Sequence, residues 1–375
     1  MNGLTAGPAV RAGVRRIPGG EHMRLIDLVR AAGVETVAIV GTAKNVGKTV
    51  TLNCVVRQAE EDGLTPGITS TGRDGERIDV VTSEEKPFVY APEGCLLATA
   101  EATLRESEVY AEILEVLPYT TLMGDVVLGR VMEPGNVEIV GPETASQLRQ
   151  TIEAMQRHGA TPVFVDGAID RVASAAPTIT GCTIVATGAA VAPTMTEVLD
   201  RTALLVEFFG LRSPADAMLL QAARRADRDK VVALIDDRYA IRPLHLKTAL
   251  EAGGAIASLI SDSTRAVVFG GAVVDAILEP LMEMRDRVKQ VEVLAHDATR
   301  MFLSRRVWDR FRRLGGRMSV VHPVRILALT INPVAPGGMS FNPDEFLGRV
   351  ARVASGIPVF DLVLGKAENL GGDGR

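Results

Sequence analysis

The sequence predicts an α/β protein with a mostly parallel sheet, followed by a second, smaller α/β domain. Short apolar runs alternate with glycine-rich turns and helical patterns, which is typical of parallel sheets. The alternation pauses in a helix-rich stretch, residues 195–227, and then begins again. A length of 375 residues also suits two domains. We therefore expect a flexible N-terminal extension at 1–20, a first domain at 21–227 and a second domain at 228–375, with a possible partner-binding role.

In the first domain, apolar runs predict strands and 3.6-residue spacing predicts helices. The expected strands are TVAIVG (36–41), the start of TPGITSTGRDGERID (65–79), TPVFVDGAID (161–170) and CTIVATGAAV (182–191). The expected helices are EHMRLIDLVRAAGV (21–34), KTVTLNCVVRQAEEDG (48–63) and LRQTIEAMQRHGA (148–160). This order of strand, glycine loop and helix predicts a ligand site beyond the carboxyl ends of the strands.

The second domain repeats the same alternation. The expected strands are KVVALIDD (230–237), AVVFGG (266–271), QVEVLAHD (290–297), VRILALTINP (324–333) and PVFDLVLG (358–365). Helical patterns lie between them at 273–288 and 298–315. The segment 300–317 places Trp308 and Phe311 among seven arginines, which predicts an amphipathic helix with a solvated basic face, and less strongly a docking helix.

Composition excludes several classes of protein. The 41 basic and 46 acidic residues give a net charge of −5, which argues against a dedicated nucleic-acid binder. Cys54, Cys95 and Cys182 lie far apart and the five histidines are scattered, so we expect neither a disulfide framework nor a histidine-based metal site. No run approaches the ~18 apolar residues of a membrane span. These features predict a cytoplasmic protein.

The segment GTAKNVGKT (41–49) carries the strongest functional signal. It lies between an apolar strand and a helix, and it ends in Gly47-Lys48-Thr49 as a phosphate-binding P-loop does. Five residues separate Gly41 from Gly47, where the standard loop has four. Backbone N–H groups at such a helix start converge on phosphate oxygens. The expected nucleotide-binding residues are Gly41, Thr42, Asn45, Val46, Gly47, Lys48 and Thr49.

Magnesium needs oxygen ligands near this loop. The Thr49 hydroxyl is one, and Asp166 ends an apolar strand where a metal-linked acid is expected. The polar loop after the second strand offers Asp74, with Glu76 and Asp79 close by. We expect Thr49, Asp74 and Asp166 to hold Mg²⁺, and Lys48 and Asp166 to act in catalysis.

The loop resembles the GT-four residues-GK[ST] loops of dethiobiotin synthetases and cobyric acid synthases. These families belong to a class of P-loop NTPases that often carries a second lysine five residues before the loop lysine. Here that position is Ala43, and Lys44 follows it. The substrate lysine of dethiobiotin synthetases is missing from GITSTGRDGE, and Cys95 lacks the glutaminase elbow of cobyric acid synthases. The sequence therefore lacks the residues that the ligase and amidotransferase reactions of these families use.

A wider resemblance covers most of the chain. The strings GTAKNVGKTVTLN, TSTGRDGERIDVVTSEEKP, VFVDGAIDRVAS and LTINPVAPGGMSFNPDEF are similar to P-loop proteins described as lysine 5,6-aminomutase reactivase subunits. Members of this family accompany adenosylcobalamin-dependent lysine and ornithine aminomutases in amino-acid fermentation. The resemblance implies ATP- and Mg²⁺-dependent rescue of an enzyme that holds damaged cobalamin. It also implies a possible second, MutS-like ATPase subunit as a partner.

Three other functions remain open from the sequence. An ATP-dependent ligase of the dethiobiotin-synthetase type is the main alternative. A regulatory module that binds nucleotide without hydrolysing it is another, and a nucleic-acid ATPase is disfavoured by the charge balance. No Asn-Lys-x-Asp motif that would specify guanine is evident, so we expect ATP.

Overall fold

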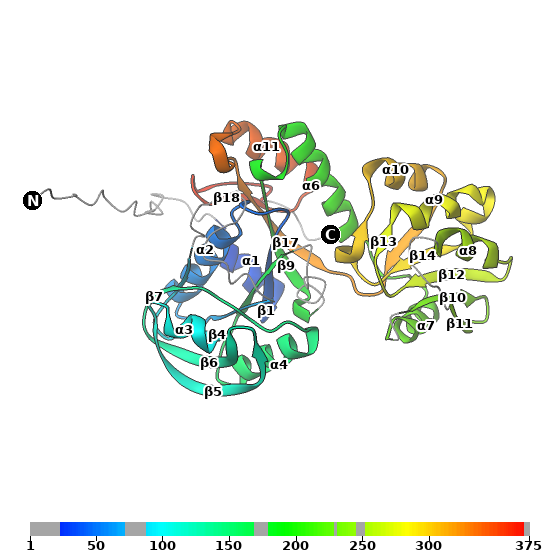
Figure 1. The fold of residues 1–375 in the computed structure, drawn as a ribbon. Helices are drawn as coiled ribbons and strands as arrows, with labels where there is room; N and C mark the ends of the chain where they lie inside the picture. The colour runs from blue at the N-terminus through cyan, green and yellow to red at the C-terminus, as the bar shows by residue number, and fades with distance from the viewer. Residues whose placement is uncertain (1–22, 72–87, 169–178, 229–230, 245–251, 371–375) are drawn as a thin grey trace, which may run out of the picture.

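The computed structural model describes residues 23–71, 88–168, 179–228, 231–244 and 252–370. Figure 1 shows a large α/β unit on the left and a smaller one on the right, with α6 (Met195–Phe209) on the side of the large unit that faces the smaller one. An α/β fold with a large, mostly parallel sheet is confirmed. Within these residues, no helix has the length and apolar character that crossing a membrane requires.

Among the described residues the large sheet has ten strands, and the central ones run parallel. β1 occupies the middle and is buried along its whole length, as expected for a strand covered on both faces. In spatial order the strands are β19 (Lys366–Glu368), β18 (Val359–Asp361), β17 (Arg325–Asn332), β9 (Cys182–Gly188), β1 (Thr36–Gly41), β8 (Val163–Ala168), β2 (Gly67–Ser70), β4 (Leu96–Ala100), β6 (Gly124–Glu133) and β5 (Tyr110–Thr121).

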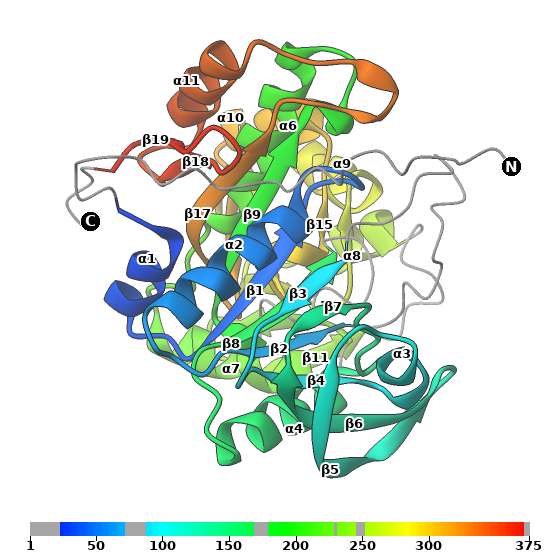
Figure 2. The same cartoon turned by 90° about the vertical axis from the view of Figure 1, so that its left-hand side faces the viewer.

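Helices cover both faces of this sheet, as Figure 2 shows. Along β1, Val37 and Ile39 face one apolar cluster while Ala38 and Val40 face the other, because side chains alternate along a strand. The first cluster includes α1 (Leu25–Ala32) and α2 (Lys48–Glu61). The second includes α4 (Ala145–Arg157), α6 (Met195–Phe209) and α11 (Pro343–Val353).

One edge of the sheet was not anticipated from the sequence. β5 and β6 form a long antiparallel hairpin that pairs with β4. Two further pieces lie beside it: α3 (Glu101–Arg105), and a short pair made of β3 (Val89–Ala91) and β7 (Gly135–Val137). Antiparallel strands at the edge of a parallel sheet are common in α/β proteins.

The smaller unit contains a five-stranded sheet, with helices on both faces. Its strands are, in order, β11 (Ile241–Leu244), β10 (Val232–Asp236), β12 (Thr264–Phe269), β14 (Glu292–Ala295) and β16 (Arg317–Val320). α7 (Ala217–Arg228) packs on one face, and α8 (Ala252–Leu259), α9 (Asp275–Glu283) and α10 (Arg305–Arg313) pack on the other. β13 (Val273–Val274) pairs with β15 (Met301–Phe302).

The expected domain limits differ from this arrangement at both ends. α7 belongs with the smaller sheet, although the sequence places it in the first domain. The final strands, β17 to β19, lie in the large sheet, although the sequence places them in the second domain. β17 pairs in parallel with β9 over most of its length, so the chain returns to the large sheet after the smaller unit. The smaller unit is therefore an insertion between α6 and β17. The expected extension at 1–20 lies outside the described residues.

Candidate functional site

The glycine-bounded loop joins β1 to α2 at the carboxyl edge of the large sheet. Gly41 ends β1, and a Cβ added there would lie 3.0 Å from Val46 Cγ2 and 3.2 Å from the Ala43 carbonyl oxygen. Gly47 precedes α2 with φ +93°, and Asn45 has φ +60°. A left-handed conformation at Gly47 suits glycine, because a side chain there would be strained. The loop thus folds tightly back over the end of β1.

The N-terminus of α2 faces out of this loop. Lys48 and Thr49 occupy the first turn, and both are partly exposed. Among the described residues no side chain caps the helix. The first N–H groups of an α-helix have no intrahelical acceptor, and the helix dipole favours an anion beside them. This end of α2 therefore has the chemistry of a phosphate site.

Lys48 and Asp166 meet across the central strands. β8 pairs with β1 in parallel, with Asp166 opposite Ile39. Lys48 Nζ lies 3.0 Å from Asp166 Oδ1, and the two side chains are 26% and 20% exposed. Asp166 Oδ1 is shielded from solvent. Among the described residues it accepts no hydrogen bond, so its contact with Lys48 is an ion pair alone. The structure thus brings together the two residues that the sequence selected for catalysis.

Strands that are remote in sequence hold the loop in place. Asn332 ends β17, and its Nδ2 donates to the Asn45 carbonyl oxygen at 3.0 Å. Asn332 Cβ would lie only 3.3 Å from a Cβ added to Gly47. On β9, the Ala186 carbonyl oxygen accepts from Thr42 through both its backbone N–H, at 2.9 Å, and its Oγ1, at 3.2 Å. Asn332 is not among the site residues predicted from the sequence, although a polar residue at the end of an apolar run was a visible signal.

Asp74 lies outside the described residues, together with Glu76 and Asp79. Thr71, the last described residue before them, donates its backbone N–H to the Asp166 carbonyl oxygen at 2.9 Å. Of the three expected magnesium ligands, Thr49 and Asp166 are therefore the two that the structure describes.

The cysteines have no reactive character. Cys95 is fully buried, and burial raises the pKa of its thiol far above the usual range. Burial likewise raises the pKa of Cys54 to about 11. Thiols with such pKa values stay protonated at neutral pH and are poor nucleophiles.

The arginine-rich segment forms α10, and its apolar side chains Val307, Trp308 and Phe311 pack into the smaller unit. The amphipathic interpretation is therefore confirmed for these side chains.

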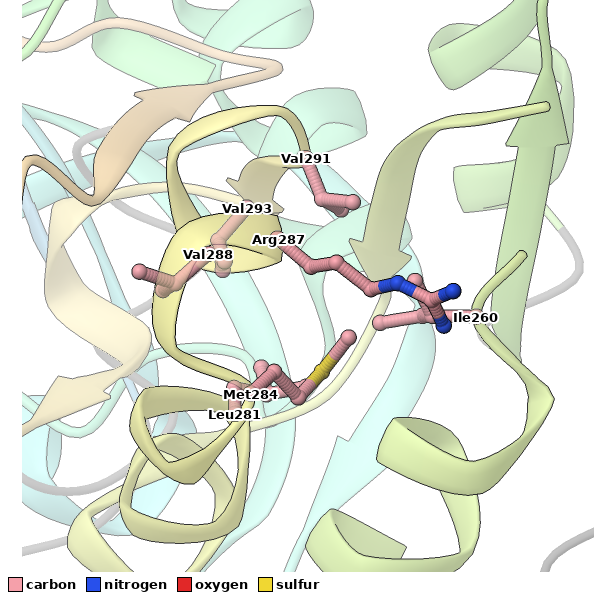
Figure 3. A pocket seen from close by; sticks show the side chains of 7 residues that line it. All are labelled: Ile260, Leu281, Met284, Arg287, Val288, Val291 and Val293. Carbon is pink, nitrogen blue, oxygen red and sulfur yellow. The ribbon is translucent and has the colours of Figure 1, made fainter. Parts of the chain in front are cut away.

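A small pocket in the smaller unit is lined by apolar groups including Ile260, Met284 and Val288 beside Arg287, as Figure 3 shows. A pocket with this lining offers no group suited to catalysis.

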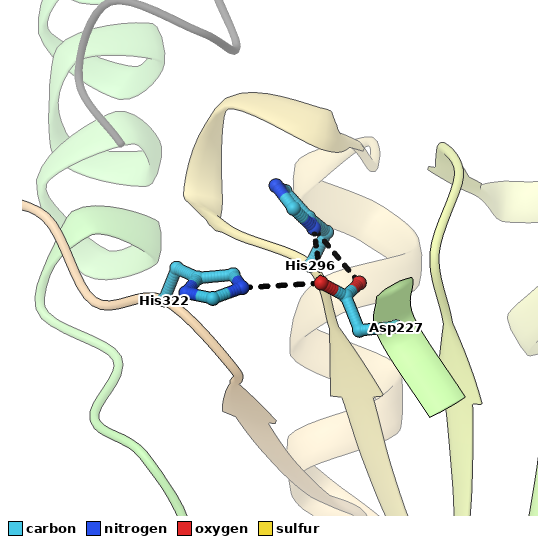
Figure 4. A group of neighbouring side chains, drawn as sticks. All are labelled: Asp227, His296 and His322. Atoms are coloured by element: carbon cyan, nitrogen blue, oxygen red, sulfur yellow. Dashed lines mark hydrogen bonds and ion pairs between the residues drawn. The ribbon is translucent and has the colours of Figure 1, made fainter. Parts of the chain in front are cut away.

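Histidines that lie far apart in the sequence meet in the smaller unit (Figure 4). His296 and His322 both contact the carboxylate of Asp227. Burial alone would raise the pKa of Asp227, but hydrogen bonds from the two imidazoles outweigh it and hold the pKa well below its usual range. No motif groups these residues, since 69 and 95 positions separate Asp227 from the two histidines.

Comparisons of the chain with models of protein families, with curated proteins and with solved structures gave no match.

Proposed function

We propose that this protein binds Mg-ATP at the loop between β1 and α2, hydrolyses it, and uses the cycle to reactivate or assist an adenosylcobalamin-dependent aminomutase. The observation that carries the nucleotide-binding step is the approach of Lys48 to Asp166 at 3.0 Å. A lysine at the start of a helix and an acid at the end of the adjacent parallel strand provide the charges that Mg-ATP requires. The partner is suggested by the sequence resemblance alone.

The residues present fit the nucleotide and the metal ion. Gly47 and Gly41 keep the loop close to the helix start, where Cβ atoms would crowd it. Asp166 Oδ1 accepts no hydrogen bond among the described residues and contacts Lys48 as an ion pair, so it can take a metal or a metal-bound water once Lys48 turns to the phosphates. The Thr49 hydroxyl lies one residue after the loop lysine, as a P-loop magnesium ligand does.

Each side chain then has a definite task. Lys48 exchanges its ion pair with Asp166 for the β- and γ-phosphates. Asp166, released from Lys48, holds Mg²⁺ or its waters together with Thr49. The N–H groups of the loop and of the first turn of α2 bind phosphate oxygens. When bound, Mg-ATP supplies the phosphoanhydride whose hydrolysis drives the cycle.

A continuous path links the loop to the smaller unit. Thr42 is hydrogen-bonded to β9, and β9 continues through a short turn into α6. Near the far end of α6, Glu207 accepts hydrogen bonds from Arg305 and Trp308 of α10. Loops that order around a γ-phosphate and relax after hydrolysis move the elements they contact. This path supports a role for the smaller unit in contacting the partner enzyme.

The test measures Mg-ATP binding and turnover by the wild type, by Lys48→Ala and by the control Lys366→Ala. Lys366 is half-exposed on the edge strand β19 and pairs with Asp344, far along the sheet from the loop. Each protein is assayed alone and with an aminomutase inactivated by hydroxocobalamin. We expect Lys48→Ala to lose binding and turnover, while Lys366→Ala behaves as wild type.

The two parts of the proposal fail separately. If wild type and Lys48→Ala bind ATP equally, the nucleotide site is not at this loop. If turnover depends on Lys48 but the inactivated aminomutase neither stimulates it nor regains activity, the partner is wrong and the nucleotide site stands.

A further inference from the structure

We propose that Asp227, His296 and His322 form a site for a divalent transition metal ion of the zinc class, with one coordination position left open. The proposal concerns the smaller unit and is independent of the nucleotide site. It rests on the convergence of three ligand atoms, on their position at the sheet edge and on an unpartnered carboxylate oxygen behind one of the histidines.

The three side chains converge on one point. His296 Nδ1 lies 2.8 Å from both carboxylate oxygens of Asp227, and His322 Nε2 lies 3.1 Å from Oδ2. Ligand atoms from the three residues all lie within 4.8 Å of one another. In a tetrahedral zinc site with bonds of 2.0–2.1 Å, neighbouring ligand atoms are about 3.3 Å apart. The contacts of 2.8 and 3.1 Å between the imidazoles and Asp227 are close to this separation.

The backbone fixes both histidines. His296 directly follows β14 and His322 follows β16, two strands that pair in parallel. His296 N donates to the Phe269 carbonyl oxygen at 3.1 Å, and His322 N donates to the His296 carbonyl oxygen at 2.9 Å. Asp227 comes from α7, which packs beside these strands. The site thus lies at the carboxyl edge of parallel strands, where α/β sheets bind ligands.

Asp297 supplies an independent indication of a ligand. It is fully buried, and its Oδ1 accepts hydrogen bonds from Thr299 N at 2.7 Å and Thr299 Oγ1 at 2.6 Å. Its Oδ2 has no hydrogen-bond partner among the described residues and lies 3.5 Å from His296 Nε2. A histidine that binds a metal through one ring nitrogen usually gives its other N–H to a carboxylate. His296 has this arrangement, with Asp227 on its Nδ1 side and Asp297 on its Nε2 side.

The donor set decides the class of ion. Two imidazoles and one carboxylate suit zinc and its first-row neighbours, whereas Mg²⁺ and Ca²⁺ prefer oxygen ligands alone. Three protein ligands leave a fourth position for water or for a ligand. The His322 side chain is 40% exposed, so an ion can enter from solvent.

The experiment uses the full-length protein, freed of metal with a chelator and desalted, and titrated with Zn²⁺ by calorimetry. Wild type is compared with His322→Ala, His296→Ala and the control His158→Ala. His158 also pairs with a carboxylate, Glu115 at 3.3 Å, but it lies at the C-terminal end of α4, which packs against the large sheet. Co²⁺ serves as a second probe, because its visible absorption intensifies when it enters a four- or five-coordinate site.

We expect wild type and His158→Ala to bind one equivalent of Zn²⁺ that the other two variants lose. Asp297→Asn keeps all three ligands and is expected to weaken binding about 10- to 100-fold, as the loss of an outer-shell carboxylate does. Circular dichroism checks each fold, and the exposed His322→Ala keeps the test valid if a buried variant unfolds. Lys48→Ala should bind Zn²⁺ as wild type does. Equal Zn²⁺ binding by wild type and His322→Ala, or none by wild type, would overturn the site.

Discussion

The contact between α6 and α10 allows a worked prediction. Glu207 on α6 accepts hydrogen bonds from Arg305 Nη1 at 2.6 Å, Trp308 Nε1 at 2.7 Å and Arg312 Nη1 at 3.1 Å. Glu207→Gln keeps the size of the side chain but replaces one acceptor oxygen with an NH₂ group that faces these donors. The substitution therefore removes the charge from a carboxylate that three donors surround.

The magnitude follows from those three bonds. Hydrogen bonds to a charged group contribute about 1.5–3 kcal/mol each when buried. Glu207 is 31% exposed and Arg312 is 59% exposed, so solvent screening reduces the sum. We expect Glu207→Gln to lower the free energy of unfolding at pH 7 by about 1–3 kcal/mol. The control Glu279→Gln, whose partner Arg306 is 73% exposed, should cost below about 1 kcal/mol.

The effect should also depend on pH. Burial by itself raises the pKa of Glu207, but the hydrogen bonds from Arg305 and Trp308 outweigh it and leave the pKa below its ordinary value. A carboxyl whose pKa is lowered in the folded state contributes stability above its unfolded pKa, and loses it as the pH falls through the folded pKa. The difference between wild type and Glu207→Gln should therefore be constant from pH 8 to 5 and shrink below about pH 4.3.

The assay is urea unfolding followed by the emission of Trp308, the only tryptophan in the sequence. Trp308 Nε1 donates to Glu207, so a change in its emission in the folded variant would also report the loss of the carboxylate. A Glu207→Gln protein as stable as the Glu279→Gln control at pH 7 would refute the reasoning. So would a difference from wild type that stays the same down to pH 3.

Three other predictions can be checked separately. Asn332→Ala removes the hydrogen bond to Asn45, so it should weaken ATP binding about 5-fold, which corresponds to a loss of ~1 kcal/mol. The circular dichroism spectrum should stay unchanged. Unchanged ATP affinity would mean that β17 does not support the loop. Gly47→Val forces a β-branched residue to φ +93° beside Asn332, so ATP affinity should fall in a binding titration more than for Asn332→Ala, and a smaller fall would contradict this. Raised pKa values should leave Cys54 and Cys95 unlabelled by iodoacetamide at pH 8 until urea is added, as mass spectrometry would show. Rapid labelling of either residue in the native protein would contradict its raised pKa.

The sequence by itself determined the centre of the large unit. A continuous apolar run, two glycines and a helical pattern predicted β1, the loop and α2, because these signals depend on neighbouring residues. The same local logic predicted Asp166 at the end of an apolar strand, and the structure places it in β8, two residues before the strand ends. Lys48 and Asp166 could be paired in advance only by assuming that β1, which leads into the loop before Lys48, lies beside β8, and the sheet confirms that it does.

Only the tertiary structure decided the contacts between distant segments. Asn332 reaches Asn45 across 287 positions, because β17 returns to the large sheet beside β9. The same return makes the smaller unit an insertion, which no composition change marks. His296 and His322 reach Asp227 because parallel strands end at one edge, and strand order is fixed by packing between segments rather than by local pattern. Sites built from such segments can be recognised only when the order of the strands in the sheet is known.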